Sequence, residues 1–395
     1  MRAGPSQEEV RRQNLGALLR LVHRHGALSR AELTARLGLN RSTIGALTAD
    51  LTAAGLVTEK APRETGRAGR PSLVVSPRSD AVGGYALAIG VDRLRAARVG
   101  LGGVVLDRRE VARVPGQPRA EAVKLVASFV AEMQAAAPAG GQCIGCGVAV
   151  SGRSRDADGT VRLSPPLGWA EEPLRAALVP ALPGDLPVSL GATADLAALA
   201  EHSRGVATGC DNLIYLSGDV GVSAGIIAGG RRVTGHGGVT GEVGHMVVHP
   251  GGHPCGCGSR GCWETEVGEA ALLRAAGRTG ATGREAVRAV VDAAARGDAT
   301  ARAAVRQVGD WLGFGVGNLV NIFNPEMVIF GEQLRDIYLA AAAPLRSRLN
   351  AIGLAGSRAH VRLRTPLLGD EAVLIGAAEL AFDGLLADPL DAVGR

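Results

Sequence analysis

Aromatic residues and long apolar segments are both scarce in this 395-residue chain. Aromatics make up 3% of it, so alanine, valine, leucine and glycine must supply most of the packing. There is no run of 18 or more apolar residues, which argues against a membrane-spanning helix. The N-terminal segment also lacks the apolar stretch of a secretory signal, so we expect a cytoplasmic protein. Its length suggests two or three domains with a sizeable apolar core.

Cysteines are few as well. Six in a chain of this length do not make a disulfide scaffold. Three of them, Cys255, Cys257 and Cys262, nevertheless crowd into eight residues, which indicates a metal site. Cys143 and Cys146 fall in an apolar segment that is expected to be a buried strand, where structural thiols are favoured over a redox pair.

Charge is distributed unevenly along the chain. Residues 1–78 contain thirteen lysines and arginines and six acids, a balance of +7. Because the whole chain carries +5, the remainder carries −2. A small basic segment attached to a nearly neutral body indicates a polyanionic partner, such as double-stranded DNA, for that segment alone.

The basic segment has the pattern of a winged helix-turn-helix. Apolar residues at helical spacing predict its first helix. Ser29 and Glu32 form a capping box at the start of the second, and Gly38 ends it. We expect three helices and two strands, over residues 13–25, 30–38, 41–55, 56–60 and 72–77. A DNA-binding domain is therefore predicted over residues 1–78.

The start of the third helix offers residues that could read DNA. In a helix-turn-helix the second helix of the pair enters the major groove with its N-terminal residues facing base edges. Here these residues are Asn40, Arg41, Ser42 and Thr43. Arg41 can pair bidentately with guanine, while Ser42 and Thr43 suit phosphate or base contacts. Asn40 is also expected to cap the helix.

A second DNA contact is predicted in the polar loop between the two strands. Arg67 and Arg70 stand there among glycines, so both could lie in a narrow minor groove. The alternative is a flexible charged linker. The position between two strands favours a wing.

From about residue 83, strand clusters alternate with helices, and the alternation occurs twice. Such alternation predicts two α/β lobes facing across a cleft. The first lobe is expected over about 79–195 with a C-terminal helix near 370–385, and the second over about 196–369. Strands are expected at 85–92, 99–107, 145–152, 212–227 and within 323–332, and helices at 119–137, 193–204, 266–310 and 370–382.

Residues 241–264 read GEVGHMVVHPGGHPCGCGSRGCWE. The spacing C-x-C-x4-C supplies three thiolates from one loop, and an imidazole would complete a closed tetrahedral zinc site. By position alone, His245, His249 and His253 are all candidates for the fourth ligand.

This run resembles the signature of the ROK family of repressors, uncharacterised reading frames and sugar kinases, GE-x-GH followed by C-x-C-G-x2-G-C-x-E. SRAEL, GLNRST and AGRP near the N-terminus are similar to the repressor branch. The resemblance covers nearly the whole chain. It implies a winged helix-turn-helix followed by a two-lobed actin-like, ribonuclease-H-like ATPase fold. It also implies that His245 joins the cysteines in holding structural zinc, and that Glu242, His245 and Glu264 bond sugar hydroxyls. A surface carboxylate is the alternative for either glutamate.

The residues depart from the family's kinase pattern. Kinase members carry Asn-Asp-Ala-Asn, whose Asp is the general base, where this chain has residues 192–195. Thr193 takes the place of the base, and threonine cannot accept a proton near neutral pH. No glycine turn for phosphate follows Asp92, Pro166 replaces a sugar-binding Asn, and Asp219 lies where ATP phosphates would approach. We therefore expect no enzyme activity, because phosphoryl transfer needs a base and positioned phosphates.

Together these features favour a DNA-binding transcription regulator, a repressor of carbohydrate-related genes whose kinase-like domain senses a sugar or sugar-derived effector. Binding to a pseudo-palindromic operator would need a homodimer or a dimer of dimers. Two alternatives stay open. One is an ATP-dependent sugar kinase with an accessory DNA-binding domain. The other is a repressor controlled by a protein partner.

Overall fold

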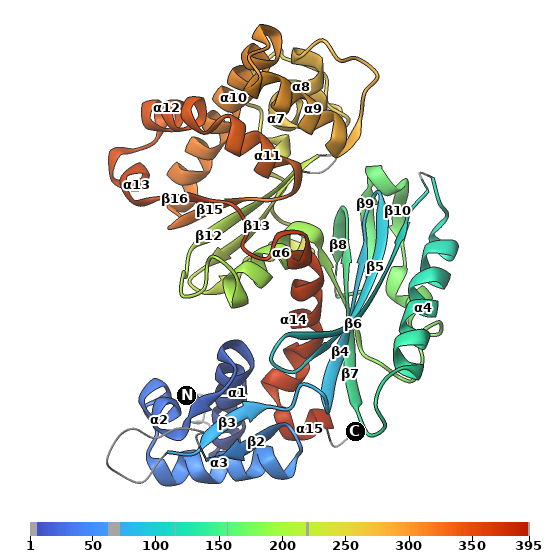
Figure 1. Ribbon diagram of the computed structural model, residues 1–395, viewed down its shortest axis with the longest axis vertical. Helices are drawn as coiled ribbons and strands as arrows, with labels where there is room; N and C mark the ends of the chain where they lie inside the picture. Colours follow the sequence, from blue (N-terminus) through green and yellow to red (C-terminus); the bar gives the residue numbers. More distant parts are fainter. Residues whose placement is uncertain (1–5, 62–71, 115, 156, 219–220, 394–395) are drawn as a thin grey trace. The chain divides into compact units, whose positions relative to one another are not determined.

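The structure, a computed structural model, describes residues 6–61, 72–114, 116–155, 157–218 and 221–393 (Figure 1). The chain forms two compact units, residues 1–191 with 377–395, and residues 192–376. The winged helix falls in the first unit, and its separate folding over residues 1–78 stays a prediction. Within the described ranges, no helix combines the length and the apolar character needed to cross a bilayer.

The N-terminal part of the first unit is the predicted winged helix-turn-helix. It consists of α1 (Gln7–His25), β1 (Leu28–Ser29), α2 (Arg30–Leu37), α3 (Arg41–Ala53), β2 (Val57–Lys60) and β3 (Val74–Pro77). The strands pair antiparallel in the order β1-β3-β2. The predicted capping box of Ser29 and Glu32 is present. Helix α1 begins six residues before the predicted start, because Ser6 and Glu9 form another capping box.

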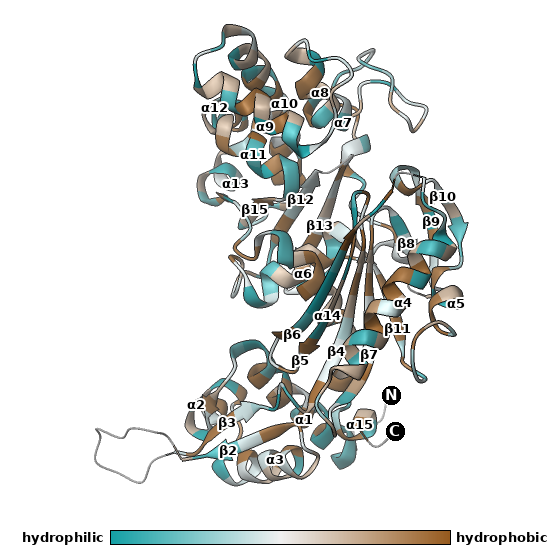
Figure 2. Ribbon diagram, turned by 45° about the vertical axis from the view of Figure 1, so that its right-hand side comes forward, coloured by the Kyte–Doolittle hydropathy of each residue, from teal (hydrophilic) through white to brown (hydrophobic). Residues whose placement is uncertain are grey.

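The rest of the first unit is built on a five-stranded sheet covered by α4 (Arg119–Ala135), which packs against β5. Its strand order is β11-β7-β4-β5-β6. These strands are β4 (Val82–Ile89), β5 (Arg93–Gly100), β6 (Val104–Ala112), β7 (Gln142–Val150) and β11 (Val188–Ala192). The central strands are apolar, whereas the edge strand β6 is hydrophilic along its middle (Figure 2).

One strand prediction in this sheet was wrong. The expected strand at 99–107 spans the turn between β5 and β6, where Gly102 and Gly103 both have positive φ. Three arginines in β5 hid its alternating apolar pattern, in which Leu94 and Ala96 face the core. A small antiparallel sheet follows β7, formed by β8 (Arg153–Arg155), β9 (Thr160–Ser164) and β10 (Trp169–Glu172), with α5 (Leu174–Leu178) after it.

The second unit begins at the start of α6 (Thr193–Arg204) and contains another five-stranded sheet, in the order β14-β13-β12-β15-β16. Read from β6 to β11, the first sheet has the same strand order as the second. If the strands of each sheet are numbered along the chain, both orders are 3-2-1-4-5. This repeated topology agrees with the two-lobed ATPase fold that the sequence predicts. The strands are β12 (Leu213–Gly218), β13 (Val222–Ala228), β14 (Arg231–Arg232), β15 (Met327–Phe330) and β16 (Arg362–Arg364).

The stretch at 266–310 is helical, as predicted, and consists of four helices. Glycines interrupt it, with Gly277 and Gly297 in left-handed conformations that other residues rarely adopt. The helices are α7 (Glu264–Val267), α8 (Glu269–Ala275), α9 (Gly283–Ala295) and α10 (Ala299–Phe323). Further along the chain come α11 (Glu332–Ala340), α12 (Ala342–Ile352), α13 (Ala355–His360), α14 (Ala372–Ala387) and α15 (Pro389–Val393).

Helix α14 contributes to both units, because residues 372–376 belong to the second and 377–387 to the first. Glycines bring backbones close to it. In the first unit, Gly147 of β7 lies against the Ala377 carbonyl, where a Cβ would not fit. In the second, Gly376 of α14 lies equally close to the Leu196 carbonyl of α6.

Candidate functional site

Helix α3 presents the residues that the sequence assigned to DNA. The Asn40 side chain caps the helix as expected, accepting the Thr43 N–H at 2.8 Å. It also accepts the Ser42 hydroxyl at 2.7 Å, so that hydroxyl is turned toward the cap. Arg41 and Ser42 are exposed, whereas Thr43 is half-buried. Of the four residues, Arg41 is therefore the best placed to reach a base edge.

The outer face of α3 has a feature that the sequence motifs did not indicate. Ala46 and Ala49 are exposed at helical spacing from Ser42, opposite the buried Ile44 and Leu47. Small outward residues let a helix lie close to the floor of a groove. The exposed positions follow from the same period that marks the buried ones, so the sequence did contain this signal.

Ion pairs link α3 to α1 and β2 to α2. Arg11 of α1 pairs with Asp50 of α3 at 2.5 Å. Arg30 of α2 donates to Glu59 of β2, with Nη2 at 2.6 Å from Oε2.

Strands β2 and β3 pair as the wing requires, from Val57 opposite Pro77 to Lys60 opposite Val74. Arg67 and Arg70 lie outside the described residues, so their role as wing-tip contacts stays a prediction.

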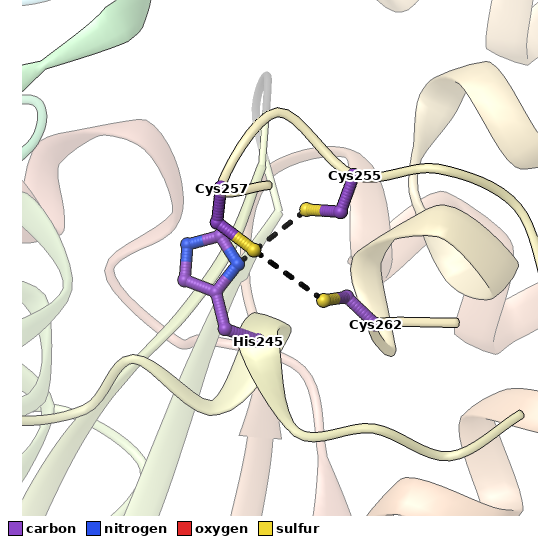
Figure 3. Close-up of side chains that lie close together, drawn as sticks. All are labelled: His245, Cys255, Cys257 and Cys262. Carbon is purple, nitrogen blue, oxygen red and sulfur yellow. Dashed lines mark hydrogen bonds between the residues drawn. The ribbon is translucent and has the colours of Figure 1, made fainter. Parts of the chain in front are cut away.

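The second unit contains a cluster of four metal-ligand side chains. The ligand atoms of His245, Cys255, Cys257 and Cys262 lie within 4.8 Å of one another. Cys255 Sγ is 3.6 Å from His245 Nδ1, and Cys257 Sγ is 3.6 Å from Cys262 Sγ. Figure 3 shows the four side chains pointing toward one another. Three thiols and an imidazole could together hold a metal ion.

Local structure explains why His245 joins the cysteines. It ends the short 3-10 helix Val243–His245, and the bridge between Val247 and Cys262 brings the cysteine loop back beside it. His249 is engaged elsewhere, with its Nδ1 3.3 Å from Glu266 and its ring stacked on Trp311.

Glycines let the cysteine loop turn tightly. Gly258 and Gly261 have positive φ, and Gly261 packs against the His249 carbonyl so closely that a Cβ would not fit. Cys255 is tied into the turn, because its N–H donates to Ser259 O at 2.9 Å.

The pKa values of the three thiols are shifted in different directions. Burial raises the pKa of Cys255 and of Cys262. The hydrogen bond from the Ser259 backbone lowers the pKa of Cys257, the exposed one of the three. A bound cation would favour all three thiolates, since metal ligation requires the deprotonated form.

Two carboxylates flank this cluster. His245 Nε2 lies 3.6 Å from Glu242 Oε2, and His245 Nδ1 lies 3.6 Å from Glu264 Oε1. The structure thus brings together the three residues predicted to bind a ligand. Glu264 is turned inward, since it accepts the Cys255 thiol at 2.9 Å and the Val222 N–H at 3.4 Å. Glu242 is the more exposed of the two carboxylates, with 33% of its side chain accessible against 22%.

Asp195, in the first turn of α6, was not singled out as a site residue. It is buried, and its Oδ1 finds no hydrogen-bond partner among the described residues. Burial raises its pKa to about 7, Arg232 opposes that shift, and Glu242 adds to it. The sequence offered little signal, because an Asp at the third position of a helix is usually an exposed first-turn acid.

The structure also describes the segments in which the sequence departs from the kinase pattern. Strand β5 begins at Arg93, and the Gly90 N–H donates to the Arg93 carbonyl at 3.0 Å, so a tight hairpin follows β4. The buried Arg113 contacts this turn, because its backbone N–H donates to Asp92 O at 2.8 Å. Thr193 is the first residue of α6, and Pro166 lies in the 3-10 helix Pro165–Leu167.

Glu332, the first residue of α11, has φ 45, a left-handed conformation that favours glycine. Asp219 lies outside the described residues.

Comparison with known proteins agrees with this arrangement. The ROK family matches residues 84–383, and the MarR family matches residues 16–68. The chain is 27% identical to the xylose repressor of Bacillus subtilis, over 96% of this chain and 97% of that protein. It is 31% identical to the glucokinase of Streptomyces coelicolor, over 75% of this chain and 97% of the glucokinase.

Among solved structures, a ROK family transcriptional regulator, a homolog of the E. coli MLC protein, has the same fold. The TM-score is 0.81 over 98% of this chain and 100% of that chain, at 24% identity. Since the ROK match covers most of its length and the MarR match covers its first domain, the chain belongs to the ROK family, in the branch with an N-terminal winged helix-turn-helix.

Proposed function

We propose that this protein is a cytoplasmic DNA-binding repressor of genes for sugar use, whose ROK domain senses a ligand and transfers no phosphate. One observation carries the proposal. A basic winged helix with Arg41 exposed at the start of its reading helix is joined to a ROK domain that has Thr193 where kinases have their base. The direct test is a footprint of the purified protein on its own upstream DNA, repeated with a panel of sugars. Unchanged affinity after removal of residues 1–75 would contradict DNA binding by this domain.

In this proposal the protein binds a pseudo-palindrome as a homodimer or a dimer of dimers. Two reading helices on a two-fold axis would meet half-sites separated by whole turns of the duplex. Sedimentation of the protein with and without operator DNA measures the stoichiometry, and a monomer on a single half-site would overturn this part.

The metal cluster fits zinc. Three sulfur donors and one nitrogen form the tetrahedral set that Zn²⁺ prefers, whereas Mg²⁺ and Ca²⁺ prefer oxygen. His245, Cys255, Cys257 and Cys262 would hold the ion, with His245 binding through Nδ1, the nitrogen that faces the thiols. With four protein ligands and no open position, the zinc would serve a structural role. Nε2, which lies 3.6 Å from Glu242 Oε2, would then carry the ring's hydrogen.

The same loop would contact the effector. Glu242, His245 and Glu264 offer acceptors and a donor for vicinal hydroxyls, so a sugar or sugar derivative is the expected class. Ala192, Thr193 and Pro166 do not supply the polar contacts that kinase members use. A plain sugar should therefore bind weakly. Because a relative is named a xylose repressor, D-xylose leads the panel for calorimetry. Binding that Glu242→Ala abolishes would support the assignment.

A sugar kinase with an accessory DNA-binding domain is the second candidate, favoured by the similarity to a glucokinase. An ADP-release assay with ATP and the same sugars separates the two functions. Sugar-dependent ADP formation would move the enzyme to first place.

A further inference from the structure

Helix α1 of the DNA-binding domain packs against the C-terminal end of α14. Gly16 packs against the Leu386 carbonyl, where an added Cβ would come within 2.5 Å. Arg20 Nη1 donates to the same carbonyl at 2.8 Å. At the exposed edge of the contact, Arg12 lies 3.7 Å from Asp388. Within the first unit, α1 therefore contacts the backbone at the end of α14 closely.

One buried imidazole lies at the centre of this interface. His23 of α1 is 0% exposed, and its Nε2 lies 3.2 and 3.3 Å from the carboxylate oxygens of Glu379 in α14. Its Nδ1 accepts the N–H of Gly102, in the turn between β5 and β6, at 2.9 Å. The Phe382 ring packs beside it, 4.8 Å between centroids. Three segments far apart in the sequence thus meet at one side chain.

The hydrogen bonds determine which tautomer is present. Because Nδ1 accepts a backbone N–H, it cannot carry a hydrogen, so the neutral ring must carry it on Nε2 and donate it to Glu379. Apolar packing alone would allow α1 to slide or rotate on α14 at small cost. A buried donor–acceptor pair does not, since a shift of one residue would leave both groups unpaired in the interior. The pair therefore specifies one position of the DNA-binding domain on α14.

Helix α14 also reaches the unit that holds the ligand-site residues. Its residues 372–376 belong to the second unit, with Glu242, His245 and Glu264. Gly376 lies against the backbone of α6 there, with no room for a side chain. Residues 377–387 belong to the first unit, where Glu379 meets His23. One continuous helix is thus in close contact at both of its ends.

We propose that His23 and Glu379 are positioning residues that transmit ligand binding in the second unit to the winged helix through α14. The inference rests on the proposed function, because it assumes that DNA binding and ligand binding are coupled. By reciprocity, operator DNA must then change the behaviour of the second unit, and this can be measured before the ligand is known.

The test measures hydrogen exchange of the full chain with and without its own upstream DNA. In the unaltered protein, operator DNA should slow exchange in α6 and in residues 372–376 by about fivefold or more, the low end of ordinary coupling. Glu379→Met removes the acceptor and should abolish this change in the second unit while the protein still binds DNA. Glu379→Gln keeps an oxygen that can accept from Nε2, so DNA should again slow exchange in the second unit. Asp388→Asn is the matched control at the exposed edge, and in this variant DNA should slow exchange as in the unaltered protein.

The outcomes are distinguishable. If the unaltered protein does not bind its upstream DNA, both the proposed function and the role of His23 and Glu379 are overturned. If it binds DNA but exchange in the second unit is unchanged, only the role of His23 and Glu379 is overturned. The same holds if DNA slows exchange in Glu379→Met as much as in the unaltered protein. Thermal unfolding of each variant shows whether it is folded. Should Glu379→Met not fold, Glu379→Asp, which shortens the reach by one methylene, takes its place with the same expected loss.

Discussion

The metal-ligand loop and the segments expected to handle phosphate differ in how well they match the family pattern. Residues 241–264 contain each side chain that the family resemblance requires, and the structure gathers them around His245. The hairpin after β4 contains Arg93 where the resemblance expects a phosphate turn, and α6 begins at Thr193 where it expects a base. The two groups of residues lie on different segments, so each can match or depart from the family pattern without the other.

The largest effect is expected at the metal cluster. Cys257→Ser should remove the single bound zinc and lower the free energy of unfolding by several kcal/mol, because metal binding contributes directly to folding of such loops. Elemental analysis and denaturant unfolding measure both. Cys210→Ala, which removes another thiol from the same unit, should leave the zinc content unchanged. Carefully purified protein without zinc would end the assignment.

Asp195 should make stability depend on pH. Its pKa in the folded protein, about 7, exceeds the ordinary 3.8. The stabilisation that the protonated side chain gives to the fold is therefore fully present below about pH 3.8 and is lost as pH rises toward 7. At pH 8 the charged form should destabilise the fold by up to about 4 kcal/mol. Asp195→Asn should therefore stabilise the protein at pH 8, and much less at pH 5.

Denaturant unfolding at the two pH values measures the difference. Asp185→Asn, at an exposed position, is the matched control for the loss of a carboxylate. Equal stabilisation by Asp195→Asn at both pH values would show that Asp195 is not held in its protonated form.

Arg41→Ala tests the expected role of α3 in reading DNA. Loss of one bidentate base contact should cost about 1–3 kcal/mol and relax selectivity at one base position. Competition binding against operators substituted at each position measures this. Arg36→Ala removes another exposed arginine, from α2, and should weaken binding equally for all sequences if it has any effect. A uniform loss with Arg41→Ala would assign Arg41 to phosphate instead.

The smallest effect is expected from Thr193→Asp. Restoring a carboxylate at the base position should produce no ADP above background, because the tight hairpin after β4 still offers no phosphate turn. A ROK glucokinase in the same assay is the positive control. Measurable sugar-dependent turnover by this variant would show that the nucleotide site has survived.

Patterns within a few residues predicted most of the winged helix and the three cysteines of the metal-ligand cluster. The capping box of Ser29 and Glu32 and the cap at Asn40 are such local patterns, and both are present. Patterns of glycine and arginine misled where they broke the expected period. The turn at Gly102 divided an expected strand in two. The stretch at 266–310 is helical as predicted, and Gly277 and Gly297 lie between its helices.

What the sequence determined by itself was therefore local: the caps, the spacing of three cysteines, the basic first domain and the threonine at position 193. Each depends on contacts or identities within a short stretch of chain. Tertiary structure alone decided the inward turn of Glu264, the burial of Asp195 and the meeting of His23 with Glu379, which are 356 positions apart. The physical reason is that burial and pairing between distant segments depend on how helices pack on sheets, and no short-range pattern encodes that packing.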